Sequence, residues 1–184
     1  MQNYIKLPFT FDSDQLKNDL ATILPTEWSR HFNDQYFHGD WSGVALRSVG
    51  GLVPQLYLDP NADNRCYSDT SLLARCRYMQ QVINTFQCEK EAVRLLRLGP
   101  KSSIREHVDY GLGYQDGSIR VHIPVVTNPD VDFYLAGEQI IMREGESWYL
   151  DFSLPHRVEN RGATDRIHLV IDCCVNDWIG SLLF

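Results

Sequence analysis

Polar and apolar positions alternate in the C-terminal half of the chain with the period of two that is typical of β-strands. In the clearest case, Arg166 and His168 fall on one face of a strand while Ile167 and Leu169 fall on the other. Glycine, proline and asparagine residues separate this stretch from similar ones before it. The pattern predicts eight short strands, at residues 92–98, 104–109, 118–127, 131–135, 139–142, 147–150, 156–160 and 166–173.

The N-terminal half has apolar residues at helical spacing in two places. Residues 12–14, Asp-Ser-Asp, are a good N-cap region for a helix that stops before Pro25, so a first helix is predicted over residues 13–24. A longer apolar stripe predicts a second helix over residues 68–87, packed on the outside of a sheet. The other segments are an extended lead-in at 1–11, a stretch without a clear element at 25–40 and a strand at 41–48.

Many short strands joined by turns predict an antiparallel sandwich or barrel, so the expected class is mainly β with flanking helices (α+β). A chain of 184 residues is long enough for one domain with a proper core and short for two. We expect one domain over residues 1–184, with helical and loop support at 1–90 and the β core at 91–175. The Pro-, Asp- and Asn-rich stretch 52–67 is either a lid over a substrate or a tolerated insertion.

Composition excludes several classes of partner. A formal net charge of −7 does not fit the clustered basic surface that nucleic-acid binding needs. No run approaches the roughly 20 apolar residues of a membrane-spanning helix, and the first residues lack the features of a signal peptide. We therefore expect no membrane association and a cytoplasmic location. The five cysteines lack C-x-x-C spacing and are expected to be reduced thiols.

Three side chains form a candidate metal site. His107 and Asp109, two apart, share one face at the end of a predicted strand, and His156 follows 47 positions later (156 − 109) beside the proline at position 155. Each alone has an ordinary alternative, such as a strand histidine, a turn cap or a surface histidine. Together, two imidazoles and one carboxylate are the donor set of the facial triad that holds non-haem Fe(II).

Arg166 follows ten residues after His156, on the polar face of its strand. A buried arginine is costly unless it meets an anion, and the guanidinium group fits a carboxylate in two parallel hydrogen bonds. A dicarboxylic cosubstrate would supply such an anion.

A family resemblance is carried by five sequence blocks, R-L-G-P-K-S-S-I-R-E-H-V-D, R-V-H-I-P-V-V-T, G-E-S-W-Y-L-D, H-R-V-E-N-R and R-I-H-L-V-I-D, within residues 93–173. This half of the chain resembles the aspartyl/asparaginyl β-hydroxylase family of Fe(II)- and 2-oxoglutarate-dependent dioxygenases. It is similar to a bacterial branch that includes free-proline hydroxylases. The resemblance implies a double-stranded β-helix (jelly roll, cupin-like), Fe(II) as the metal, 2-oxoglutarate as cosubstrate and O2 as oxidant.

The resemblance also implies roles for individual residues. His107, Asp109 and His156 would bind the metal, and Arg166 would bind the far carboxylate of 2-oxoglutarate. The inward-facing pair in R-V-H-I-P, Arg120 and His122, would add cosubstrate contacts, although a solvated edge strand is the alternative for both. His168 either touches the same carboxylate or only packs. No catalytic side chain beyond the metal ligands is expected.

The function implied is hydroxylation of an unactivated C–H bond in an amino acid or amino-acid-like small molecule. Two alternatives stay open: a peptidyl Asp/Asn β-hydroxylase, and a cupin-like metal-binding protein that is non-catalytic or independent of 2-oxoglutarate. Arg94, Arg97 and Arg105 are each either a contact for a substrate carboxylate or a surface residue, and Trp148 is expected to be a core aromatic. The sequence gives no signal for the oligomeric state.

Overall fold

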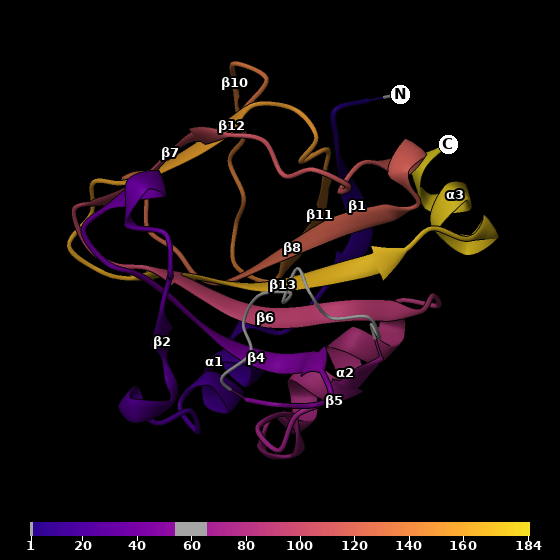
Figure 1. Cartoon of the computed structure of the whole chain (residues 1–184), viewed down its shortest axis with the longest axis horizontal. Helices are drawn as coiled ribbons and strands as arrows, with labels where there is room; N and C mark the ends of the chain where they lie inside the picture. The colour runs from indigo at the N-terminus through magenta and orange to yellow at the C-terminus, as the bar shows by residue number, and fades with distance from the viewer. Residues whose placement is uncertain (1, 54–65) are drawn as a thin grey trace.

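Two antiparallel β-sheets form the framework of the molecule in a computed structural model, which describes residues 2–53 and 66–184 (Figure 1). The large sheet contains β1 (Tyr4–Thr10), β2 (Ser29–Arg30), β4 (Trp41–Val49), β5 (Tyr67–Asp69), β6 (Lys90–Leu98), β8 (Ser118–Val126), β11 (Glu146–Leu150) and β13 (Arg166–Cys174). The small sheet contains β3 (Phe37–His38), β7 (Ser102–His107), β9 (Val131–Leu135), β10 (Glu138–Gln139) and β12 (His156–Asn160). The strand orders are β1-β11-β8-β13-β6-β4-β2, with β5 beside β4, and β10-β9-β12-β7-β3.

The outer face of the large sheet is apolar and is covered by helices. These are α1 (Ser13–Leu20), α2 (Arg77–Thr85) and α3 (Asp177–Leu183). Ile167 and Leu169 of β13 are buried in one cluster with Leu16 of α1, Met79 of α2 and Ile179 of α3. Burying one such side chain stabilises the fold by about 1.5–3 kcal/mol, so this face anchors the large sheet.

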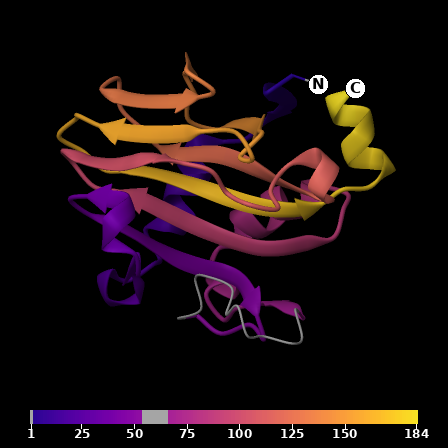
Figure 2. The same cartoon turned by 45° about the horizontal axis from the view of Figure 1, so that its top comes forward.

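The space between the sheets has a second, smaller apolar cluster that includes Phe133, Phe152 and Val158. Figure 2 shows the small sheet lying over one face of the large sheet. Because successive strand residues point to opposite faces, the alternation that buries Ile167 against the helices turns Arg166 into this space. The sandwich interior therefore combines an apolar part with buried charged and imidazole groups.

The main predictions for the fold are confirmed. The described part of the chain is mainly β with three α-helices, and its two facing sheets are those of a jelly roll. The β framework is wider than the predicted 91–175 core, because β1 and β4 pair with β11 and β6 inside the large sheet. The first ninety residues thus supply strands as well as support.

The predicted helix over 68–87 is wrong in its first half. Residues Tyr67–Asp69 form β5 along the edge of β4, and Thr70 donates its backbone N–H to Leu46 O (2.9 Å) and its hydroxyl to Ala45 O (2.9 Å). A short 3-10 turn at Leu73–Arg75 follows, and α2 begins only at Arg77. Pairing with a neighbouring strand has overridden the local helical spacing.

Other boundaries also differ from the predictions. The first helix ends at Leu20, the strand predicted over 139–142 is the short β10, and the strand predicted over 104–109 ends at His107. The segment 25–40 contains the short strands β2 and β3. The candidate lid at 52–67 falls almost wholly on residues 54–65, outside the described part of the chain.

Gly39 lies where the chain crosses from β3 in the small sheet to β4 in the large one. Its φ of +88° is in the left-handed region, and a Cβ there would meet the Ser102 hydroxyl at 2.2 Å. A glycine is therefore needed at this crossover. Within residues 2–53 and 66–184, no helix has the length and apolar character to cross a membrane, and all five cysteines are free thiols.

Candidate active site

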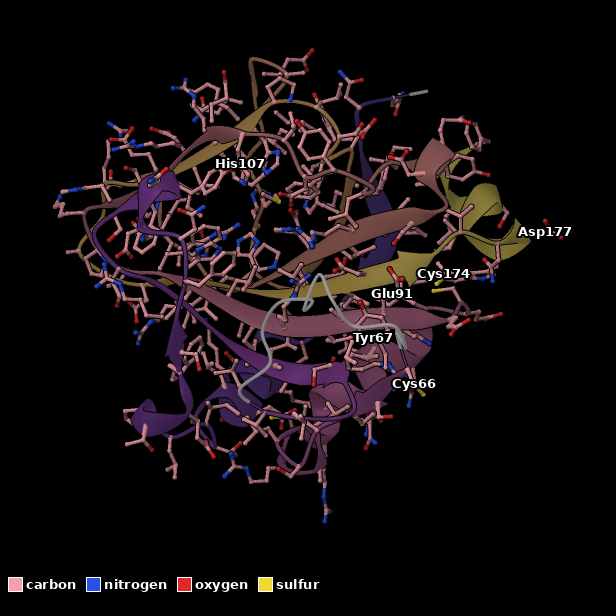
Figure 3. The ribbon with its side chains drawn as sticks, in the orientation of Figure 1. Cys66, Tyr67, Glu91, His107, Cys174 and Asp177 are labelled. Atoms are coloured by element: carbon pink, nitrogen blue, oxygen red, sulfur yellow. The ribbon has the colours of Figure 1, made fainter. Side chains whose placement is uncertain are left out.

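His107 and His156 face each other across two neighbouring strands. His107 is the last residue of β7 and His156 the first of β12, and they are direct register partners, with ring centroids 4.2 Å apart. In Figure 3, His107 lies next to the ribbons of β7 and β12. Nδ1 of His107 lies 2.8 Å from Arg105 O, and Nδ1 of His156 lies 3.0 Å from Leu154 O. A carbonyl only accepts, so each Nδ1 carries a proton, and in a neutral imidazole Nε2 is then the atom with the lone pair.

Asp109 completes the group from the loop after β7. The prediction that it shares a strand face with His107 is wrong, because β7 has ended; its N–H donates to Phe152 O (2.9 Å) instead. Its Oδ1 lies 3.6 Å from Nε2 of His107. One ligand atom from each of His107, Asp109 and His156 lies within 4.8 Å of the others. Among the described residues, these three side chains form a group that could hold a metal ion.

The protonation state of His156 suits metal binding. Burial lowers the pKa of His156 to about 4, so its imidazole is neutral near pH 7. A divalent cation needs deprotonated ligands, and two neutral imidazoles with one carboxylate fit Fe(II) with coordination positions left open. The residues present therefore match the metal that the resemblance implies.

A chain of charged groups, half-buried at Asp109 and Arg120 and buried at Asp172 and Arg94, runs across the large sheet. Arg120 of β8 donates from Nη1 to Asp109 Oδ2 (2.6 Å), and from Nε and Nη2 to the two oxygens of Asp172 on β13 (2.7 and 3.0 Å). Arg94 of β6 pairs with Asp172 from the other side. Burial alone would raise the pKa of Asp172, but the charges of Arg120 and Arg94 lower it below its usual value, so this carboxylate is ionised.

Arg166 and two histidines form a second polar group on the same face. Nη2 of Arg166 lies 3.0 Å from Nδ1 of His168, which lies 3.2 Å from Nδ1 of His122. Arginine only donates, so Nδ1 of His168 accepts and Nδ1 of His122 is the second donor to it. Burial lowers the pKa of both imidazoles well below the ordinary value, and both are neutral.

Arg166 is 3% exposed, and burial lowers its pKa to about 9. Its Nε is buried and has no hydrogen-bond partner among the residues that the structure describes. An ionised guanidinium without a carboxylate partner in such surroundings is costly. The group is therefore disposed to accept an anionic ligand.

One cavity of about 650 Å³ brings these groups together, and a smaller one of about 260 Å³ reaches Arg166 from the β8–β9 side. The predicted residues that line the large cavity are His107, Asp109, Arg120, His122, His156 and Arg166. His168 lines only the smaller one. Apolar walls of this cavity include Phe133, Phe152 and Val158.

The three arginines considered as contacts for a substrate carboxylate lie in different parts of the molecule. Arg94 lines the large cavity, whereas Arg97 pairs with Asp40 near the surface and Arg105 lines an outer groove of the small sheet. Trp148 packs against the smaller core cluster and not in the cavity, as expected.

Several cavity residues were missed in the sequence. His31 and Trp41 stack at 3.7 Å between centroids, and Tyr36 lies beside His107. Residues 25–40 carry no periodic pattern, so nothing indicated that His31 or Tyr36 would reach the site. Asp172 was missed although a signal existed, because it continues the inward series that begins with Arg166.

Fold and site together define a double-stranded β-helix with a His-Asp-His group between its sheets. Residues 11–175 match the family described as Aspartyl/Asparaginyl beta-hydroxylase. The chain belongs to this family, and the predicted resemblance is confirmed over a longer stretch than the five blocks indicated.

Two curated relatives are proline hydroxylases. The L-proline cis-4-hydroxylase of Rhizobium meliloti (strain 1021) is 29% identical over 165 residues, which are 88% of this chain and 57% of the relative. The L-proline cis-3-hydroxylase 1 of a Streptomyces species is 24% identical over 177 residues, 94% of this chain and 60% of the relative. The chain thus spans less than two thirds of the length of either relative.

A solved structure supports the fold. An oxidoreductase from Burkholderia pseudomallei, described as a member of the 2OG-Fe(II) oxygenase family, superposes with a TM-score of 0.65. The alignment covers 95% of this chain and 86% of that one at 14% sequence identity. At this identity the match shows the shared jelly roll and no more.

Proposed function

We propose that this protein is an Fe(II)- and 2-oxoglutarate-dependent dioxygenase, one domain that hydroxylates an unactivated C–H bond of a free amino acid or a similar small molecule. The observation that carries the proposal is the convergence of three ligand atoms, from His107, Asp109 and His156, in the cavity that Arg166 also lines. Membership of the family and similarity to two proline hydroxylases support it.

His107, Asp109 and His156 are the proposed metal ligands. Nε2 of each histidine is the donor, because Nδ1 is held by a backbone carbonyl of the same chain segment. These carbonyls fix the tautomer and the ring orientation before metal arrives. The protein itself thus supplies three ligand atoms that lie within 4.8 Å of one another.

Arg166 is the proposed anchor for the far carboxylate of 2-oxoglutarate. Its Nε and remaining N–H groups offer a fork to two carboxylate oxygens, while His168 holds Nη2. His122 and His168 support the anchor by fixing its position. Arg120 acts at the metal end of the cosubstrate through Asp109, and it is also a proposed direct contact of 2-oxoglutarate.

When bound, Fe(II) with 2-oxoglutarate and O2 supplies the oxidising power for C–H hydroxylation, with succinate and carbon dioxide as coproducts. The chain contributes binding, orientation and the exclusion of water. Phe133, Phe152 and Val158 wall the cavity with apolar groups, which strengthens the interactions of the charged groups beside them. No protein group is needed to move a proton from the substrate.

A small substrate fits the site better than a polypeptide. The cavity of about 650 Å³ is within the ~300–1,000 Å³ range of small-molecule sites. Arg94 brings a guanidinium to its wall and fits a substrate carboxylate. We propose the reducing cytoplasm as the location, in keeping with free thiols at all five cysteines.

The test is a coupled assay with Fe(II), ascorbate and 2-oxoglutarate. We would measure succinate and hydroxylated product by mass spectrometry for free Pro, Asp and Asn and for short peptides that contain each residue. We expect a free amino acid to raise succinate release and to give an equal amount of hydroxylated product. His156→Ala is the inactive control.

Two results would change the proposal. Product from peptides with none from free amino acids would favour peptidyl Asp/Asn β-hydroxylation. No 2-oxoglutarate turnover with any substrate, together with tight metal binding, would favour a cupin-like metal-binding protein.

A further inference from the structure

Arg120 spans two carboxylates that belong to different parts of the molecule. On one side its Nε and Nη2 make a two-pronged contact with Asp172, at 2.7 and 3.0 Å. On the other side its Nη1 donates to Asp109 Oδ2 at 2.6 Å. A fork of this kind fixes the plane of the guanidinium, so the direction in which Nη1 points is set by Asp172.

Asp172 is well placed for this task. It is 6% exposed and lies directly opposite Arg120 in the register of β13 and β8. Arg94, from β6 on the other side of β13, also pairs with its Oδ2. One carboxylate thus pairs with two guanidinium groups, the buried one of Arg94 and the half-buried one of Arg120, and a central strand of the large sheet carries it.

The contact with Arg120 makes the two carboxylate oxygens of Asp109 different from each other. Arg120 binds Oδ2, whereas Oδ1 is the oxygen near His107, 3.6 Å from its Nε2. A carboxylate can bind a cation through one oxygen or through both. With Oδ2 held by Arg120, Asp109 presents only Oδ1 to the metal position.

The number of open positions depends on this restriction. A six-coordinate metal held by one atom each of His107, Asp109 and His156 would keep open positions for a chelating keto acid and for O2. If both oxygens of Asp109 bound the metal, one of these places would be lost. The contact between Arg120 and Asp109 therefore protects the open positions that the proposed reaction requires.

We propose that Asp172 is a positioning residue: through Arg120 it holds Asp109 as a one-oxygen ligand at the metal site. The proposal rests on the proposed function, because it takes Asp109 as a ligand. Arg94 completes the charge balance of Asp172 and keeps it in place.

Asp172→Asn tests the proposal, since the amide has nearly the same shape but no charge. Loss of an outer contact of a metal ligand typically lowers metal affinity about 10- to 100-fold. We expect a decrease of this size in Mn(II) affinity by calorimetry, and a changed visible spectrum of the Co(II) form, which reports the number and arrangement of ligands. The matched control is Asp132→Asn, which breaks a pair with Arg161 outside the site and should leave both unchanged.

A second variant is needed if Asp172→Asn does not fold because Arg94 and Arg120 both lose their contact with the Asp172 carboxylate. The double variant Asp172→Asn/Arg94→Gln removes one of these charges, while Arg120 still lacks its fork. It should fold and show the same weakened Mn(II) binding and altered Co(II) spectrum. A merely structural role would lower the unfolding midpoint and leave the metal readouts of the folded protein at wild-type values.

Wild-type Mn(II) affinity together with a wild-type Co(II) spectrum in either folded variant would overturn the proposal. These readouts need no turnover, so they distinguish a failure of the proposed function from a failure of the role of Asp172. A wild-type protein that binds neither Mn(II) nor Co(II) contradicts the proposed function itself, whereas normal wild-type binding with insensitive variants contradicts only the role of Asp172.

Discussion

Replacing Arg166 with leucine separates the contribution of this residue to binding from its contribution to stability. The side chain is 3% exposed, and its Nε has no partner among the described residues. Removal of one partner from a buried charge pair costs about 2–5 kcal/mol of binding free energy. At about 1.4 kcal/mol per factor of ten, Arg166→Leu should weaken 2-oxoglutarate binding by about 30-fold to several thousand-fold.

The same substitution should leave the free energy of unfolding of the metal-free protein unchanged or raise it. Burial lowers the pKa of Arg166 from its ordinary value to about 9, so the charged form is disfavoured in the folded state at pH 7 by on the order of a few kcal/mol. A leucine removes that cost, although it also removes the hydrogen bond to His168. We therefore expect the metal-free variant to be at least as stable as the wild type.

Two measurements decide this prediction. Calorimetric titration of 2-oxoglutarate into the Mn(II)-loaded protein gives the affinity, and urea unfolding of the metal-free protein gives the stability. Arg97→Leu is the matched control, because Arg97 pairs with Asp40 near the surface and should leave the affinity unchanged. Wild-type affinity in Arg166→Leu would refute the assignment of the carboxylate anchor.

Two further predictions concern stability. The buried imidazoles of His156, His122 and His168 have lowered pKa values, whereas unfolded histidines titrate near 6.5, so the unfolded state of the metal-free protein binds more protons in acid. Its free energy of unfolding should fall as pH decreases from 6.5 towards 4, and a flat profile in urea would contradict the burial of these rings. Met79→Ala should cost about 2–5 kcal/mol of stability in the same assay because Met79 is fully buried, with Mn(II) affinity unchanged; a loss below 1 kcal/mol would contradict the packing of α2.

The sequence predicted the structure correctly where a pattern of residues is set by a single physical cause. Strands β8 and β13 alternate strictly, because one face packs on the helices and the other lines the cavity, and the inward positions of Arg120, His122 and Arg166 followed from that alternation. His107 and His156 were found because their residue types and order match a known donor set.

It failed where contacts between distant segments set the local structure. Residues 68–76 have helical spacing, but hydrogen bonds from Thr70 to β4 hold them at a sheet edge. Asp109 was predicted in a strand, yet its position depends on a hydrogen bond from its N–H to Phe152 O. This contact joins segments that are far apart in the sequence, so the local pattern gives no sign of it. His31 and Tyr36 reach the site from a segment without periodicity, so only the folded arrangement reveals them.

The most direct test of the proposed metal and cosubstrate site is anaerobic absorption spectroscopy with Fe(II) and 2-oxoglutarate, because a keto acid chelated to Fe(II) gives a visible charge-transfer band. We expect the wild type to develop the band only when Fe(II) and 2-oxoglutarate are both present, and not with either one alone. His107→Ala, Asp109→Ala and His156→Ala should each abolish or strongly weaken it, while their unfolding transitions stay cooperative. No band in the folded wild-type protein, or a band that persists at full intensity in all three variants, would contradict a 2-oxoglutarate-binding iron site at these residues.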